Sequence, residues 1–357
     1  MGQRRFGTLQ VLGAAALWGT TGPVQVMADL RVAPAAVGAV RILTGGLVLL
    51  AWTAARRRSW RGMLPQGAAW PLLAAAGATG AFQAAYFTAV SRTGAALATA
   101  IVFGLAPIAT GLCSRLIDRS PLKLGWAAGT LCAVAGCGLL LAPDRTDGGA
   151  DALGVVLSVV AGVCYAVYTV AAKRLTDSGE NMVTAVAVTL FVGGLFLTPW
   201  LAVAGPGLFT GRALMTVAWL GPVTTALAYM LFVGGLRTVS AATAGTLSLA
   251  EPLVAAVLAV GLLHERLSVT ALAGCALLAA GLAITSLRPV RAYHLLTARC
   301  RDESVAVQEV TSDGLPLPLP HRRRWPPRPG AGDRPEDRAR PGLSRPAAGG
   351  TVRIPPR

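Results

Sequence analysis

The sequence predicts an all-α polytopic membrane protein with ten transmembrane helices, arranged as two inverted five-helix repeats. Of its 357 residues, 54% are hydrophobic and only 13% are charged, whereas soluble domains carry about 25% charged residues. Ten apolar runs approach the length of a membrane helix, and the chain repeats itself after about 145 residues. The scarcity of charge excludes a soluble protein, and the apolar content excludes a wholly disordered chain.

The ten runs each approach the 20 or so residues that a helix needs to cross the hydrocarbon core. In chain order they are residues 8–27, 34–54, 70–90, 94–117, 125–141, 153–172, 183–203, 214–236, 241–263 and 269–287. The alternative for the first run is a cleaved signal peptide, because Arg4 and Arg5 precede it and residues 26–28 resemble a cleavage site. We favour a span, since the run is long, is interrupted by Gly22-Pro23 and has a counterpart in the second repeat.

The basic residues between the runs predict the orientation of the chain. With the amino terminus inside, 14 Lys and Arg residues fall in cytoplasmic segments and five on the opposite side. Cytoplasmic loops of membrane proteins are enriched in these residues. We therefore expect a multi-pass protein of the inner (cytoplasmic) membrane, with both termini in the cytoplasm.

The internal repeat aligns residues of the same kind in the two halves. A shift of 145 residues pairs Phe87 with Phe232 and Pro107 with Pro252. Each half holds five runs, an odd number, so the second copy enters the membrane upside down relative to the first. Inverted repeats place a substrate site near the midplane, and rocking of one half against the other alternates access to it.

The chain divides into three predicted parts. Residues 1–145 form the first repeat and residues 150–289 the second, while residues 290–357 form a basic Pro/Arg-rich tail. The tail alternates leucine with proline over residues 315–320, which is typical of a disordered segment. It either touches anionic lipid headgroups through its arginines or is a solvated extension without a partner.

Several short strings resemble a known family. They are AAALWG at residues 14–19, VRIL at 40–43, AYFTAV at 85–90, and TLSLAEPLVAA at 246–256 followed by HERL at 264–267. Over about residues 8–288, their order and duplication resemble EamA-type transporters of the drug/metabolite transporter superfamily, and the AEP string resembles the threonine/homoserine-type exporters. The first repeat departs from the pattern, because Ser120 stands at the position of Glu265, with Asp118 two residues away.

The resemblance implies a secondary active transporter that exports amino acids or related small metabolites, in exchange for protons. The competing interpretation is a non-transporting membrane scaffold. An enzyme would need converging histidines or paired carboxylates, and none converge; no ATP-binding loop, metal site or cofactor is indicated. The net charge of +16 forms no basic face with interleaved aromatics, so we expect the lipid bilayer and a small solute, not nucleic acid, as partners.

Two charged residues inside the predicted spans are the strongest site candidates. Arg41 lies in the second run and Glu251 in the ninth, where an ionisable group is costly and faces a cavity or a partner. They either neutralise each other as an ion pair that locks the halves, or they contact substrate and proton. The guanidinium of Arg41 suits a carboxylate, and burial favours the protonated form of a carboxyl group, which makes Glu251 the proton-coupling candidate.

Further residues complete the predicted site. An amide and several rings lie within the spans and are expected either to line a central cavity or to pack: Trp18, Gln83, Tyr86, Tyr165, Tyr168 and Tyr229. Pro107 and Pro252 are helix-kink candidates, either passive bends or a moving gate. The Gly125-x-x-x-Gly129 spacing permits close helix contact, either within the chain or across a homodimer.

Overall fold

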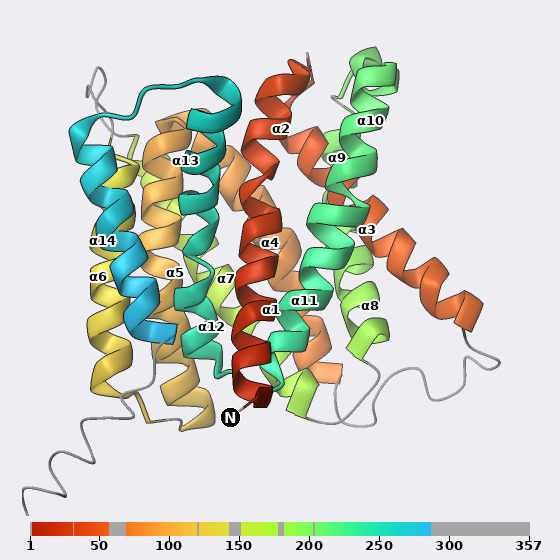
Figure 1. Cartoon of the computed structure of the whole chain (residues 1–357). Helices are drawn as coiled ribbons and strands as arrows, with labels where there is room; N and C mark the ends of the chain where they lie inside the picture. Colours follow the sequence, from red (N-terminus) through yellow and green to blue (C-terminus); the bar gives the residue numbers. More distant parts are fainter. Residues whose placement is uncertain are drawn as a thin grey trace, which may run out of the picture. The chain divides into compact units, whose positions relative to one another are not determined.

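The computed structural model (Figure 1) describes residues 2–30, 32–56, 69–119, 121–142, 151–177, 182–202 and 204–286. Every regular element within these ranges is a helix, which confirms the predicted all-α class. The predicted tail at 290–357 and most of the joint between the repeats lie outside the described residues.

The first repeat begins with two helices that share one apolar run. Its elements are α1 (Gly2–Gly19), α2 (Thr21–Ala28), α3 (Pro34–Arg56), α4 (Ala69–Thr93), α5 (Ala95–Asp118) and α6 (Leu124–Leu140). A single residue, Gly94, connects α4 to α5. Its φ of +82° is readily reached by glycine and rarely by other residues, which permits so tight a turn.

The second repeat contains more interruptions than the first. Its elements are α7 (Ala152–Asp177), α8 (Met182–Leu195), α9 (Thr198–Leu201), the 3₁₀ turn η1 (Pro206–Phe209), α10 (Gly211–Leu220), the π-helical turn η2 (Pro222–Leu227), α11 (Ala228–Leu236), α12 (Ala241–Leu247), α13 (Ala250–Leu263) and α14 (Val269–Ser286). The segments α10–η2–α11 and α12–α13 correspond to the eighth and ninth predicted runs.

Six helical segments among the described residues are long and apolar enough to cross a membrane. They are residues 35–55, 95–118, 152–177, 211–236, 241–263 and 269–286. The shorter helices α6 and α8 are also apolar. The predicted total of ten crossings therefore stays a prediction, although the arrangement of the helices fits two repeats.

The first and the ninth predicted spans are broken near their middle, in both cases close to a proline. In the first, Pro23 has no N–H to donate to the carbonyl of Gly19, and α1 ends there before α2 begins at Thr21. In the ninth, α12 ends before Ser248, and α13 begins two residues before Pro252. Breaks of this kind occur inside membranes only where protein or a cavity surrounds them.

The two kink candidates behave differently. Pro252 borders the break between α12 and α13, where the Glu251 N–H donates to the Ser248 carbonyl at 3.0 Å. Pro107 lies inside α5, which is continuous over 24 residues. Proline at equivalent positions thus interrupts one helix and not the other.

The fifth helices of the two repeats cross each other through glycines. A side chain on Gly129 would lie 3.0 Å from the carbonyl oxygen of Gly281, and one on Gly136 would lie 2.8 Å from that of Gly274. The residue number rises along α6 while it falls along α14, so these helices run antiparallel, side by side in Figure 1. Gly129 is used within the chain, whereas the Cβ position of Gly125 meets open space. The antiparallel crossing is the geometry that inverted repeats require.

The repeats interlock. The first helix of each repeat packs on the third and fourth helices of the other: α1 contacts α11 and α13, and α7 contacts α4 and α5. The second helices, α3 and α8, also pack together. The sequence boundary between the repeats is therefore not a packing boundary, and the centre of the bundle is lined by both copies.

Candidate functional site

Arg41 has an incompletely satisfied guanidinium inside the helix bundle. Its Nη1 donates to the Thr21 hydroxyl at a long 3.5 Å, and its buried Nε has no hydrogen-bond partner in the structure. Most buried polar groups in proteins are hydrogen-bonded. The side chain is therefore equipped to bind one more acceptor group, beside the first residue of α2.

Glu251 lies on the other side of the same helix break. It occupies the first turn of α13 and is partly buried. A side chain on Gly19, the last residue of α1, would lie only 2.7 Å from the Glu251 carbonyl oxygen. The α1–α2 break thus touches Arg41 through Thr21 and Glu251 through Gly19.

The two charges do not neutralise each other directly. No ion pair between described residues joins Arg41 to Glu251, although they interact electrostatically over a longer distance. The ion pair considered as a lock between the halves is therefore not formed in this structure. Instead, each charged residue contacts the α1–α2 break: Arg41 of α3 through Thr21, and Glu251 of α13 through Gly19.

An aromatic cluster adjoins this pair of charges. The Trp18 ring lies 5.3 Å from the rings of both Tyr229 and Phe232, with an edge-on contact to Tyr229. Tyr168 continues the cluster, 5.5 Å from Tyr229 and again edge-on. Such contacts are favourable between aromatic rings. They bring together residues of α1, α7 and α11 and so join both repeats.

A second aromatic cluster connects α4 to α7. Phe82 stacks on Tyr86 at 5.7 Å and lies 6.4 Å from Tyr165. The Tyr86 hydroxyl is 2.8 Å from that of Thr99, and the Tyr165 hydroxyl donates to Ser248 at 2.6 Å. Tyr165 therefore contacts the residue at which the α12–α13 helix is broken.

Gln83 carries an amide without a partner. Its side chain is only 2% exposed, and no hydrogen bond between described residues involves it.

A small cavity lies between α4, α7, α8 and α11, with Tyr168 and Thr189 as its polar lining residues. Neither Arg41 nor Glu251 lines this cavity, so the pair of charges and the cavity are separate features, with Tyr168 belonging to the cavity and to the first aromatic cluster.

The residues predicted from the sequence are partly brought together. Trp18, Tyr168 and Tyr229 share ring contacts, and Tyr86 and Tyr165 both contact Phe82. Their role in binding stays a prediction. No group of three or more potential metal ligands occurs among the residues that the structure places.

Sequence reasoning missed two hydroxyl residues that contact the candidates. Thr21 accepts from Arg41, and Ser248 accepts from Tyr165. Both stand within a few residues of a proline inside an apolar run. That proximity is the signal that would have found them, because a hydroxyl next to a proline can replace the lost backbone hydrogen bond.

Interlocked repeats, broken helices and buried opposite charges together define the class of membrane transporters with inverted repeats. Comparison with known families agrees: the model of the EamA-like transporter family matches residues 5–142 and 152–287. The chain belongs to this family, as the strings in its sequence indicated. It is a multi-pass transporter of the cell membrane.

Individual relatives cover most of the chain. It is 37% identical over 286 residues to the uncharacterized transporter YwfM of Bacillus subtilis (strain 168), covering 79% of this chain and 94% of the relative. It is 30% identical over 251 residues to the threonine/homoserine exporter RhtA of Salmonella typhimurium (strain SL1344), covering 70% and 81%. A solved crystal structure of a protein with 25% identity matches with a TM-score of 0.66, covering 78% of this chain and 95% of that one.

Proposed function

We propose that this transporter exports amino acids by alternating access, driven by exchange for protons. The supporting observation is the arrangement around the α1–α2 break, where Arg41, with its unpartnered Nε, contacts Thr21 and the backbone of Glu251 approaches Gly19. A free amino acid carries one carboxylate and one ammonium group and so complements this pair. The similarity to the exporter RhtA supports the same class of solute.

In this proposal Arg41 binds the substrate carboxylate. A guanidinium offers two parallel donors that match a carboxylate, and such charge-assisted bonds are stronger than neutral ones. The amino end of α13 lies next to the α1–α2 break, where Gly19 approaches the Glu251 backbone, and the dipole at a helix amino end favours an anionic group. The rings of Trp18, Tyr86 and Tyr229 contribute the apolar wall of the site, and the Gln83 amide offers a further hydrogen bond.

Glu251 then couples the solute to protons. As a carboxylate it attracts the ammonium group, and when it is protonated this attraction is lost and the solute is released. The carrier returns with the proton in place of the solute. One carboxyl group therefore serves both ligands in turn, and solute moves out while a proton moves in.

We also propose an orientation for the chain. Ten crossings with both termini in the cytoplasm agree with the excess of Lys and Arg in the segments assigned to that side. Fusing reporter tags after Ala142 and after Leu287 tests this arrangement. Tags on opposite faces are expected, and tags on one face would overturn it.

The decisive experiment is transport by the purified full-length protein in proteoliposomes with an imposed pH gradient. Labelled threonine and homoserine are the first solutes to test. Glu251→Gln is expected to abolish the effect of the gradient, because the amide does not titrate. Asp29→Asn, which removes an exposed carboxylate outside the helices, should behave as wild type. Unchanged gradient-driven flux in folded Glu251→Gln protein would rule out the proton role.

A further inference from the structure

The first helices of the two repeats hold equivalent places but are attached differently. Gly7 of α1 packs against Thr238, and Gly154 of α7 packs against Thr93. These contacts correspond under the shift that relates the repeats. The starts of the two helices therefore hold equivalent places, and the side chains at their ends can be compared position by position.

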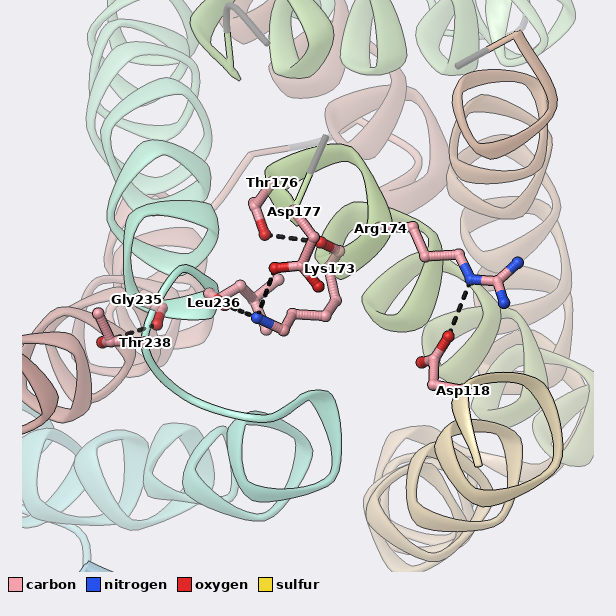
Figure 2. A network of polar contacts seen from close by, with 8 residues as sticks. All are labelled: Asp118, Lys173, Arg174, Thr176, Asp177, Gly235, Leu236 and Thr238. Carbon is pink, nitrogen blue, oxygen red and sulfur yellow. Dashed lines mark hydrogen bonds and ion pairs between the residues drawn. The ribbon is translucent and has the colours of Figure 1, made fainter. Parts of the chain in front are cut away.

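Charged contacts tie α7 to its neighbours at both ends. At its start, Asp151 forms an ion pair with Arg92 at the end of α4, at 2.9 Å. At its end, Arg174 pairs with Asp118 at 2.9 Å (Figure 2). It also donates to the carbonyl of Ile117 at 3.1 Å, and both partners lie at the end of α5. These contacts hold α7 to two helices of the other repeat.

Lys173, the residue before Arg174, contacts a third helix. Lys173 donates to the Leu236 carbonyl, the last residue of α11, at 2.8 Å and pairs with Asp177 at the same distance (Figure 2). Two consecutive residues of α7 thus cap the carboxyl ends of α5 and α11. Basic groups at helix carboxyl ends are favourable because the last carbonyls there lack helical partners.

The equivalent positions of α1–α2 lack these ties. Under the shift of 147, Arg4 takes the place of Asp151, and Arg237 is the counterpart of Arg92, so a pair of opposite charges becomes a pair of like charges. Val26 and Met27 take the places of Lys173 and Arg174 and are 61% and 60% exposed. No ion pair involves residues 2–28 within the described part of the chain.

The α7 helix and the α1–α2 segment also differ in continuity. α7 runs unbroken over 26 residues. The α1–α2 segment is interrupted at Thr20, whose hydroxyl accepts from the Trp219 indole of α10 at 3.1 Å, and the neighbouring Thr21 contacts Arg41. A break at that place lets α2 turn relative to α1 without disturbing the packing of Gly7 and its neighbours.

We infer that the two repeats do not move equivalently: α2 turns about the break at Thr20 to open the site, while α7 stays fixed to α4, α5 and α11. This inference rests on the proposed alternating access and names the element that performs it. The ion pairs and caps at the ends of α7 define the fixed element. The uncharged, exposed end of α2 defines the moving one.

Distance measurements between spin labels test the inference without any knowledge of the solute. The full chain is used in lipid nanodiscs, in a background with the six native cysteines replaced by alanine that retains the wild-type elution profile. One label pair, Val26→Cys with Met215→Cys, reports on α2 against α10. The matched pair, Ser91→Cys with Leu153→Cys, reports on α7 against α4. All four side chains are exposed and outside the proposed site.

Two distance populations are expected for the α2–α10 pair and one for the α4–α7 pair. Adding Arg92→Gln and Arg174→Gln should give the α4–α7 pair a second population, because the ties of α7 are then removed. Two populations for α4–α7 in the unmodified background, or one population for α2–α10 at every pH and solute concentration, would overturn the inference. If no amino acid is transported yet α2 alone shows two populations, the inference stands and the proposed substrate class fails.

Discussion

The helix α5 and the pair α12–α13 are equivalent spans that share a proline and differ in continuity. Pro107 and Pro252 correspond in the repeat, yet α5 is continuous and its counterpart is broken before Pro252. Proline removes one backbone donor in both. The proline is therefore not sufficient for the break, and the neighbouring residues must decide it.

The neighbouring residues differ in polarity. Ser248 and Glu251 of the second repeat correspond to Phe103 and Ala106 of the first. The Ser248 hydroxyl donates to the Ala244 carbonyl at 3.0 Å and accepts from Tyr165. A hydroxyl that bonds back to the preceding turn bends helices. The break thus lies in the copy that carries Ser248 and Glu251, and not in the copy that carries Phe103 and Ala106.

The largest expected effect concerns the crossing of α6 and α14, where both repeats contribute glycines. Gly136→Val puts a side chain into the backbone of α14, so we expect a loss of about 3 kcal/mol or more of stability. Gly138→Val is the matched control, since its Cβ position meets open space in the same helix. Thermal unfolding of the solubilised protein measures both. Equal stability of the two variants would refute the crossing.

The next effect concerns a charge that only one repeat carries. Under the shift of 148, the position of Arg41 is occupied by Thr189 in the second repeat. Arg41→Gln removes a charge-assisted contact worth about 1.5–3 kcal/mol, so we expect KM for an amino acid to rise about ten- to hundredfold. Arg212→Gln changes an exposed arginine instead and should leave KM unaltered. An unaltered KM in the folded Arg41→Gln protein would contradict carboxylate binding.

The repeats could be predicted from the sequence because apolar runs and matching residues recur along the chain at a nearly constant spacing. Apolar runs mark the helices, and the alignment of Trp18 with Tyr165 and of Pro107 with Pro252 marks the two copies. The break at Thr20 is harder to foresee, because Gly22-Pro23 inside an apolar run fits a bent helix equally well. Side-chain contacts and electrostatics, not periodicity, decide between the two.

Whether Arg41 and Glu251 form an ion pair could not be predicted from the sequence, for a similar reason. Opposite charges in two membrane helices suggest an ion pair, but whether they meet depends on which helix lies between them. Here each of them contacts the α1–α2 break separately: the Glu251 backbone approaches Gly19, and the Arg41 side chain contacts Thr21. The interlocking of the repeats, with α1 on α11 and α7 on α4, likewise follows from packing and not from the shift.

A smaller effect tests the cause of the α12–α13 break. Ser248→Ala removes the acceptor of the Tyr165 hydroxyl, so we expect a loss of about 1–2 kcal/mol in stability and a slower transport rate. Ser158→Ala is matched, because Ser158 is also buried and donates to a carbonyl four residues earlier, at 2.9 Å, without a second side-chain partner. Its cost should be under about 0.5 kcal/mol. Equal costs would show that Ser248 contributes nothing special to the break.

The smallest expected effect concerns the start of α7, where Asp151 replaces the arginine of the first repeat. The hydrogen bond from Arg92, with that from the Leu153 N–H, holds the pKa of the Asp151 carboxyl below its ordinary value of 3.8. A lowered pKa contributes stability that is present above the ordinary value and is lost as the pH falls through the folded-state pKa. Asp151→Asn, which keeps an acceptor for the helix start, should therefore unfold at a slightly lower temperature than wild type near neutral pH. The two should converge as the pH falls below the folded-state pKa of Asp151. The difference is small because the carboxyl is exposed, and salt should reduce it further.

Thermal unfolding across this pH range, with Asp29→Asn as the control, measures the difference. A difference that persists in acid would assign the effect of Asp151 to the helix start and not to its ion pair.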